Sequence, residues 1–422
     1  MHTTFWIVAW LAAAGRATCS LVPSRSTLPT GPGVWWGLAW VLAALGTLPA
    51  GAAADGDVVV ATEEASSAWA YRPELLRPFW VGDVVEAESV LFIRDEGGDK
   101  SRASVLFPIV EVIAVRNSAG DVTYEEGRDY VVTPGSREIV LSAGSRIVST
   151  AAAELRRPAG TQKYALTHRD GNGEILFGAG LEYASMQTCI TYRREQEKWK
   201  SAFPTFDPAR LPRSVVRLNT KEPLSIVTLG DSISEGANAS GMYEEAPFQP
   251  AYPELVRRHL AERFGGHVQM TNLSVGGMDS AWGTTQVDKV VAAKPDLVIL
   301  AFGMNDSAGR SAASFKENIA STMVAIRESL PECEFILVAG MLGNRDWPRL
   351  KQEAFGEYRA ALVELACPGV AVADLTTVWE GFLDRKRDWD QTGNGVNHPN
   401  DFGHRVYAQV IATLLTEPVA EP

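Results

Sequence analysis

A serine and a histidine far apart in the sequence are the side chains best suited to chemistry. Ser232 ends the triplet Gly230, Asp231, Ser232, directly after the apolar run LSIVTLG. A serine at a strand-to-helix turn points its hydroxyl into the crevice beyond the strand. His398 precedes the last helical segment, and neutral imidazole can remove a serine proton at a pH of about 7. The pair predicts nucleophilic attack by serine, although this triplet alone is equally typical of a helix cap.

The elements that must position these side chains follow Leu224, where apolar strand-like runs alternate with amphipathic helical segments. Continuous apolar strands separated by helices indicate a parallel sheet covered on both faces. Five such strands predict a flavodoxin-like three-layer αβα sandwich over residues 224–422. In this architecture ligands bind at the carboxyl ends of the strands, which is where Ser232 lies.

Three further groups of polar residues and glycines accompany the GDS triplet. They are Asn272 with Gly276 and Gly277, then Gly303 to Asp306, and finally Asn397 to Asp401. In this order and spacing, the four blocks resemble the SGNH (GDSL-type) hydrolase family over about residues 224–417. The resemblance implies that Ser232 is the nucleophile and His398 the general base. It also implies an oxyanion hole made by the backbone N–H groups of Ser232 and Gly277 and the side-chain amide of Asn305, with no metal or organic cofactor.

One position departs from the family pattern, which places an aspartate three residues before the histidine. This chain has Gly395 there, so the group that orients the imidazole must be another one. The neighbouring candidates are the carboxylates of Asp390 and Asp401, the amides of Asn394 and Asn397, and a backbone carbonyl of this loop, Gly395 included. We expect a Ser–His dyad with a carbonyl as the orienting group, which stabilises the imidazolium less than a carboxylate does.

Several other side chains near these blocks are open to a structural or a functional interpretation. Asp231 is expected to hydrogen-bond within its loop, and His404 is expected to pack or lie on the surface. The aromatic residues Tyr243, Phe248 and Trp282 could wall a sugar-binding cleft, or they could belong to the core.

The part of the chain before the catalytic blocks has a different texture. Short runs rich in valine, isoleucine and aromatic residues fill residues 57–195, and turn clusters such as NSAGD and DGNGE separate them. This pattern predicts a small all-β sandwich that serves as an accessory domain. Residues 196–223 are polar and contain prolines, so we expect a linker between the two domains.

Charge and cysteine content exclude several classes of protein. The 422 residues carry 39 basic and 51 acidic side chains, a net charge of -12, which argues against binding to nucleic acid or anionic lipid. The four cysteines form no CxxC pair, which excludes a zinc ribbon and a thioredoxin-like site. Cys333 and Cys367 each precede a strand-like run, and a disulfide between them is left open.

The N-terminus carries an apolar stretch from Gly33 to Ala50 that ends in small residues. This pattern predicts a signal peptide in residues 1–54 with cleavage near Ala54, and hence a secreted or periplasmic protein that is free of the membrane after cleavage. A retained membrane anchor is the alternative.

Taken together, the sequence predicts a secreted serine esterase that removes a short acyl group, acetyl above all, from a small molecule or a glycan. A lipase, arylesterase or thioesterase on the same frame is one alternative. The missing aspartate motivates another, a catalytically weak carbohydrate-binding protein.

Overall fold

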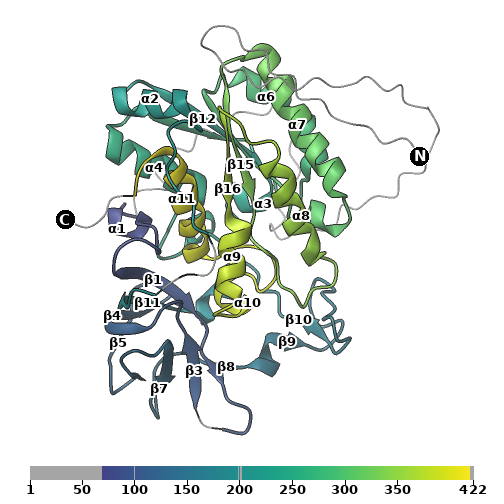
Figure 1. Cartoon of the computed structure of the whole chain (residues 1–422). Coiled ribbons are helices and arrows are strands. Elements are labelled where there is room, and N and C mark those ends of the chain that lie inside the picture. The colour runs from purple at the N-terminus through teal and green to yellow at the C-terminus, as the bar shows by residue number, and fades with distance from the viewer. Residues whose placement is uncertain (1–68, 99, 198, 200–201, 419–422) are drawn as a thin grey trace.

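The computed structural model describes residues 69–418, apart from residues 99, 198, 200 and 201 (Figure 1). The predicted signal peptide and the cleavage position near Ala54 lie outside the described residues. Within the described part of the chain, every helix is too short or too polar to cross a membrane.

The second half of the chain is built on a sheet of five parallel strands in the order β13-β12-β14-β15-β16. Their bounds are β12 Leu224–Gly230, β13 Val268–Asn272, β14 Leu297–Ala301, β15 Glu334–Ala339 and β16 Val370–Asp374. The predicted five-stranded parallel sheet is therefore confirmed.

Helices cover both faces of this sheet because successive side chains along each strand point to opposite sides. Ile226 packs with α4 and α11, whereas its neighbour Val227 packs with α7 and α8. These four helices are α4 Tyr252–Phe264, α7 Ala312–Ser329, α8 Gln352–Val363 and α11 Asp401–Leu415. The shorter helices of this part are α2 Pro212–Thr220, α3 Ser232–Glu235, η4 Ser240–Tyr243, α5 Ser280–Thr284, α6 Val287–Ala292, η5 Asp306–Ala308, α9 Leu375–Leu383 and α10 Asp388–Gln391.

A β-rich region precedes the parallel sheet and lies at the opposite end of the molecule (Figure 1). One sheet has the order β1-β11-β4-β5 and is antiparallel, and a second has the order β6-β7-β3-β2-β8, in which only β2 and β8 are parallel. The bounds are α1 Pro73–Leu76, β1 Val84–Val90, β2 Ile93–Arg94, β3 Ser101–Ser104, β4 Ile109–Asn117, β5 Thr123–Tyr124, β6 Tyr130–Val132, β7 Glu138–Leu141, β8 Thr150–Ala151, η2 Ala152–Leu155, η3 Ala184–Met186 and β11 Thr188–Arg194. A separate hairpin-like pair is formed by β9 Arg156–Arg157 and β10 Glu174–Ile175.

The β-rich region and the α/β part share one hydrophobic core. The Phe79 ring of the first part lies 5.1 Å from the Phe382 ring of the second, centroid to centroid. The fully buried Lys386 ammonium pairs with the equally buried Glu88 carboxylate across the same boundary. Residues 196–223, predicted as a linker, contain helix α2, whose Val215 is buried in this core. The contact between the two parts is therefore a packed one.

The cysteine pair left open by the sequence is not joined by a disulfide. Strands β15 and β16 are neighbours, so Cys333 and Cys367 lie before adjacent strands, as expected. Cys333 is nevertheless a buried thiol whose Sγ lies 3.6 Å from the carbonyl oxygen of Glu334. Burial raises the pKa of this thiol well above its usual range.

Candidate active site

Three of the four sequence blocks meet at one edge of the parallel sheet. Ser232 is the first residue of α3, directly after β12, while Gly277 follows β13 and Asn305 follows β14. Because β13 and β14 flank β12 on its two sides, the three loops lie side by side at the carboxyl ends of their strands. This is the edge at which the sequence predicts the site.

The turn that presents Ser232 depends on its two predecessors. A Cβ atom at Gly230 would lie 2.5 Å from both the carbonyl oxygen of Ala301 and Oγ of Ser234, so only glycine fits between β12 and β14 at this point. The Asp231 side chain caps α3 by accepting the Ile233 N–H at 3.0 Å. Burial raises the pKa of Asp231 to about 7. Both residues thus shape the turn, in agreement with the structural interpretation of Asp231.

The loop that carries Gly277 is tied to the loops on either side of it. Asn272 donates through Nδ2 to the carbonyl oxygen of Ser234 at 2.7 Å. On the other side, Asn305 donates through Nδ2 to the carbonyl oxygen of Met278 at 2.9 Å. This bond uses one of the two amide hydrogens of Asn305. The three proposed oxyanion donors therefore sit on loops that are held in a fixed relation to each other.

Ser232 and His398, which are 166 residues apart in the sequence, are brought into direct contact. Ser232 Oγ lies 2.8 Å from His398 Nε2. Desolvation, helped by the neighbouring His404, lowers the pKa of His398 to about 3. The ring is therefore neutral near pH 7, so Nε2 can accept the Ser232 proton. His404 is itself buried, with Nε2 3.0 Å from the carbonyl oxygen of Ala237, which agrees with its predicted packing role.

The other ring nitrogen of His398 faces an asparagine that the sequence did not single out. His398 Nδ1 lies 2.9 Å from Asn238 Oδ1, and Asn394 Nδ2 lies 3.1 Å from the same nitrogen. Asn238 is buried, and its own Nδ2 donates to the carbonyl oxygens of Gly180 at 2.6 Å and Gly393 at 3.1 Å. All three of these bonds of the Asn238 amide thus join segments that are distant in the sequence.

Two of the predicted orienting groups are engaged elsewhere. The carbonyl oxygen of Gly395 accepts from Asn344 Nδ2 at 2.8 Å. The Asp390 carboxylate accepts the backbone N–H of Leu91 at 2.7 Å and that of Arg387 at 3.1 Å. The Gly395 carbonyl group and the Asp390 carboxylate are thus held by these partners, and none of these contacts is with His398.

The remaining candidates also serve the loop rather than the ring. Oδ1 of Asn394 accepts three backbone N–H groups of its own turn, from Val396, Asn397 and His398. The Asp401 carboxylate accepts the N–H and the O–H of Ser240 at 2.9 and 2.7 Å. The dyad is therefore flanked by asparagine side chains and not by a carboxylate.

The aromatic residues singled out in the sequence divide between core and site. Trp282 packs against Phe302 at 6.3 Å between ring centroids, and Phe248 packs on the shared core. Tyr243 lies closer to the dyad, because its ring is next to Gly180, whose carbonyl oxygen accepts from Asn238. Only Tyr243 of the three is therefore placed beside the candidate catalytic residues.

A second aromatic group, not found from the sequence, borders the loop of His398. Phe177 and Tyr164 of the β-rich region meet edge to face at 5.1 Å between ring centroids. Together with Trp347, they pack around the buried side chain of Val396, two residues before His398. No local pattern in the sequence links these residues, since they are brought together only by the contact between the two parts of the chain.

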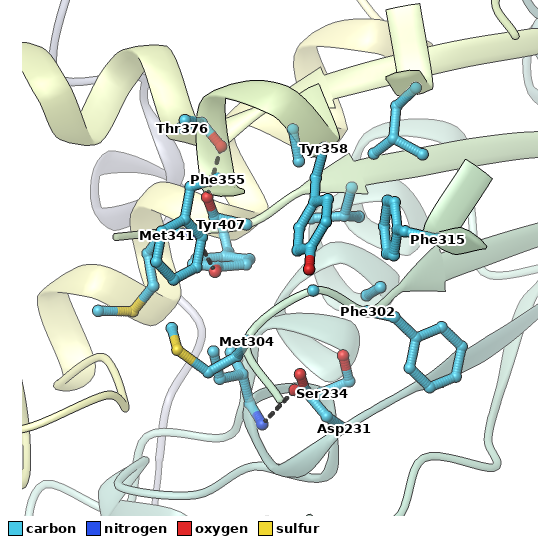
Figure 2. A pocket seen from close by; sticks show the side chains of 17 residues that line it. Asp231, Ser234, Phe302, Met304, Phe315, Met341, Phe355, Tyr358, Thr376 and Tyr407 are labelled. Atoms are coloured by element: carbon cyan, nitrogen blue, oxygen red, sulfur yellow. Dashed lines mark hydrogen bonds between the residues drawn. The ribbon is translucent and has the colours of Figure 1, made fainter. Parts of the chain in front are cut away.

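A pocket lies behind Ser232 and is distinct from the Ser232–His398 pair. Asp231 and Ser234 lie at one end of it and Thr376 at the other, as Figure 2 shows. Its remaining wall consists mostly of core side chains such as Phe315 and Tyr358. Ser232 and His398 do not line this pocket, so it belongs to the interior of the α/β part.

Replacing Asn305 with alanine is expected to lower kcat for ester hydrolysis by about 10²–10³-fold with little change in KM. The oxyanion forms only in the tetrahedral intermediate and in the transition states that flank it, so losing one donor raises the barrier without weakening ground-state binding. Steady-state kinetics would test this. Asn318→Ala is the matched control, because Asn318 donates to Ser280 Oγ on the neighbouring α5. Equal losses in the two variants would contradict a role of Asn305 as an oxyanion donor.

Comparison with known proteins gives a family and a set of distant structural neighbours. Residues 228–406 match the model of the GDSL-like Lipase/Acylhydrolase family. A two-domain esterase active on acetylated mannans is 22% identical, with a TM-score of 0.40 over 51% of this chain and 55% of that one. The lipase/acylhydrolase from Enterococcus faecalis is 24% identical, with a TM-score of 0.36 over 45% of this chain and 93% of that one. A carbohydrate esterase family 3 protein from Talaromyces cellulolyticus is 17% identical, with a TM-score of 0.36 over 45% and 94%. No curated protein matches the chain.

Proposed function

We propose that this chain, a carboxylic ester hydrolase whose residues 228–406 match the GDSL-like lipase/acylhydrolase family, removes short acyl groups, acetyl above all, from carbohydrates. Ser232 is the nucleophile and His398 the general base in this proposal. The observation that carries it is the 2.8 Å contact between Ser232 Oγ and the neutral His398 Nε2. A serine hydroxyl is a weak nucleophile until such a base removes its proton.

The reaction proceeds through an acyl-enzyme. Ser232 Oγ attacks the ester carbonyl carbon while its proton passes to His398 Nε2. The oxyanion is held by the N–H groups of Ser232 and Gly277 and by the Asn305 amide. Collapse of this intermediate breaks the ester bond, and the imidazolium returns its proton to the departing sugar hydroxyl. Water then attacks the acyl group with His398 again as base, releasing the carboxylic acid and restoring Ser232.

Two features support a carbohydrate as the alcohol part of the ester. The aromatic rings of Tyr164, Phe177 and Trp347 gather next to the loop of His398, and the C–H faces of sugar rings stack on such surfaces. The chain has a net charge of -12, which suits a neutral glycan better than a polyanion. Export, expected from the N-terminal sequence, would bring the enzyme to glycans outside the cell.

The test is a series of initial rates on p-nitrophenyl esters from acetate to octanoate, together with acetate release from acetylated mannan and acetylated xylan. We expect the rate to fall as the acyl chain lengthens, and we expect acetate release from at least one polysaccharide. Activity that rises toward octanoate would favour a lipase or thioesterase. Turnover of the small esters without release from either glycan would remove the carbohydrate part of the proposal. An absence of all turnover would favour a binding protein.

A further inference from the structure

We propose that Asn238 is the positioning residue of His398, and that the β-rich region takes part in this positioning through the carbonyl group of Gly180. The proposal rests on the proposed function, in which His398 is the base. It assigns to an asparagine beyond α3 the task for which the family uses an aspartate in the histidine loop. It also gives the β-rich region a place in the catalytic apparatus.

The orientation of the Asn238 amide follows from its hydrogen bonds. Nδ2 lies 2.6 Å from the Gly180 carbonyl oxygen and 3.1 Å from that of Gly393, and a carbonyl oxygen can only accept. Nδ2 must therefore be the NH2 group, and Oδ1 must be the atom 2.9 Å from His398 Nδ1. Because Oδ1 can only accept, Nδ1 carries the imidazole proton. This tautomer leaves Nε2 unprotonated and aimed at Ser232.

Asn394 cannot take this role, although its Nδ2 lies only 0.2 Å farther from His398 Nδ1 than Asn238 Oδ1 does, at 3.1 against 2.9 Å. Its Oδ1 accepts the backbone N–H groups of Val396 and Asn397 at 2.9 and 3.0 Å, which turns Nδ2 toward His398. An amide nitrogen has no lone pair to offer a protonated Nδ1. Nδ2 instead lies 3.1 Å from Asn397 Oδ1, to which it can donate. Asn394 therefore shapes the turn, and Asn238 fixes the ring.

The position used by the family's aspartate is closed in this chain. A Cβ atom at residue 395 would lie 2.4 Å from the carbonyl oxygen of Leu176 and 2.8 Å from Cε2 of Tyr183, both in the β-rich region. Gly395 also has a φ of +83°, which strains residues with a side chain. The β-rich region thus occupies the space that an aspartate side chain would need.

The same region holds the loop of His398 from a second direction. Gly178 donates its N–H to the carbonyl oxygen of Asn394 at 3.1 Å. Gln187 donates to the carbonyl oxygen of Thr392 at 2.9 Å and accepts from Asn400 at 2.8 Å. The bond from Asn238 to Gly180 completes this set, so the nucleophile loop and the histidine loop are both fixed to one body.

Few charged groups act on the imidazole of His398, so a new carboxylate beside it should produce a clear change in its pKa. His404 on α11 is the ionisable group that acts on His398, and its own pKa is lowered to about 4 by burial. The nearby carboxylates of Asp390 and Asp401 are directed to Leu91, Arg387 and Ser240. Introducing a carboxylate at residue 238 would therefore place a negative charge against Nδ1 of His398, which now faces the amide groups of Asn238 and Asn394.

The decisive variants are Asn238→Asp and Asn238→Ala, with Asn344→Ala as the matched control. Asn344 donates to Gly395 in the same loop but does not touch the ring. For Asn238→Asp we expect the acid limb of kcat/KM to move up by about one to three pH units, because an adjacent carboxylate stabilises the imidazolium. For Asn238→Ala we expect kcat/KM to fall by about 10²–10⁴-fold. For Asn344→Ala we expect the acid limb of kcat/KM to have the same midpoint pH as in the wild type.

A purely structural role for Asn238 would lower activity without moving the acid limb, and such a result would overturn the proposal. If the alanine variant fails to fold, the aspartate variant and the wild-type tautomer decide. Nitrogen-15 NMR of the histidine-labelled wild type, assigned with His398→Gln, should show His398 protonated on Nδ1. Protonation on Nε2 would also overturn the proposal. Because the tautomer is measured without substrate, a failure here is distinct from a failure of the proposed esterase activity.

Discussion

Ser232→Ala is expected to lower kcat for p-nitrophenyl acetate by about 10⁴-fold or more, the largest effect of any single substitution in this chain. Removing a serine nucleophile eliminates the acyl-enzyme pathway, and only direct attack by water within the oxyanion hole is left. KM should change little, since the hydroxyl contributes little to binding of the ground state. The measurement is steady-state hydrolysis with the variant purified away from any wild-type enzyme, because a trace of the latter would dominate the residual rate.

Ser234→Ala provides the matched control, because Ser234 lies two residues after Ser232 in the same short helix. Its Oγ lies 2.7 Å from the hydroxyl of Tyr252 and does not contact His398. Loss of this bond is expected to cost about 1 kcal/mol of stability and to leave kcat within a few-fold of wild type. Retention of more than about one per cent of activity in a folded Ser232→Ala protein would move the nucleophile assignment to another residue.

The parallel sheet could be predicted because its signal is local. Continuous apolar runs such as Leu297–Ala301, which is buried along its whole length, can be recognised as strands of a covered sheet without knowledge of their partners. The order of the strands then brings Ser232, Gly277 and Asn305 to one edge. The type of each residue and its position at a strand end were sufficient to predict this grouping, because neighbouring parallel strands end on the same side of the sheet.

The proposed orienting group of His398 could not be predicted because it depends on contacts between distant segments. Asn238 adopts a φ of +65°, and it bonds to Gly180 and Gly393, which are 58 and 155 residues away. Nothing in the segment ISEGANASG distinguishes this asparagine from a loop residue. The departure at Gly395 was visible, but its reason lay in the β-rich region, which occupies the space around that glycine.

The β-rich region and the α/β part are packed against each other through one shared core. Residues 57–195 were expected to form an accessory domain, yet the described residues of that segment contribute to the shared core and to the surroundings of His398. Lys386 and Glu88 form a buried ion pair, and removing one partner of such a pair strongly destabilises a protein because the other charge stays unpaired. Separation of the two parts would therefore expose apolar surface and an unpaired charge, and it would release the histidine loop.

The pH dependence of kcat/KM should show no inflection near pH 6.5 and should fall only below about pH 4. The base acts when neutral, and burial lowers the pKa of His398 from 6.5 to about 3. Lowering the pH from 7 to 5 therefore leaves His398 unprotonated in the folded enzyme. Acetate release from p-nitrophenyl acetate, measured at each pH in quenched samples, gives the profile independently of the ionisation of nitrophenol.

Stability must be followed in parallel, because the same burial acts on folding. In the unfolded chain His398 and His404 take up protons below about pH 6.5, whereas in the folded protein their pKa values are about 3 and about 4. Acid therefore favours the unfolded state through these two residues. The raised pKa of Asp390, about 6, acts in the opposite sense, since its contribution to stability is lost as the pH rises from about 4 to 6. Samples held at each pH and then assayed at pH 7 separate reversible titration from denaturation. A reversible acid limb with a midpoint near 6.5 would mean that His398 is hydrated in the working enzyme, in conflict with its buried position between Ser232 and Asn238.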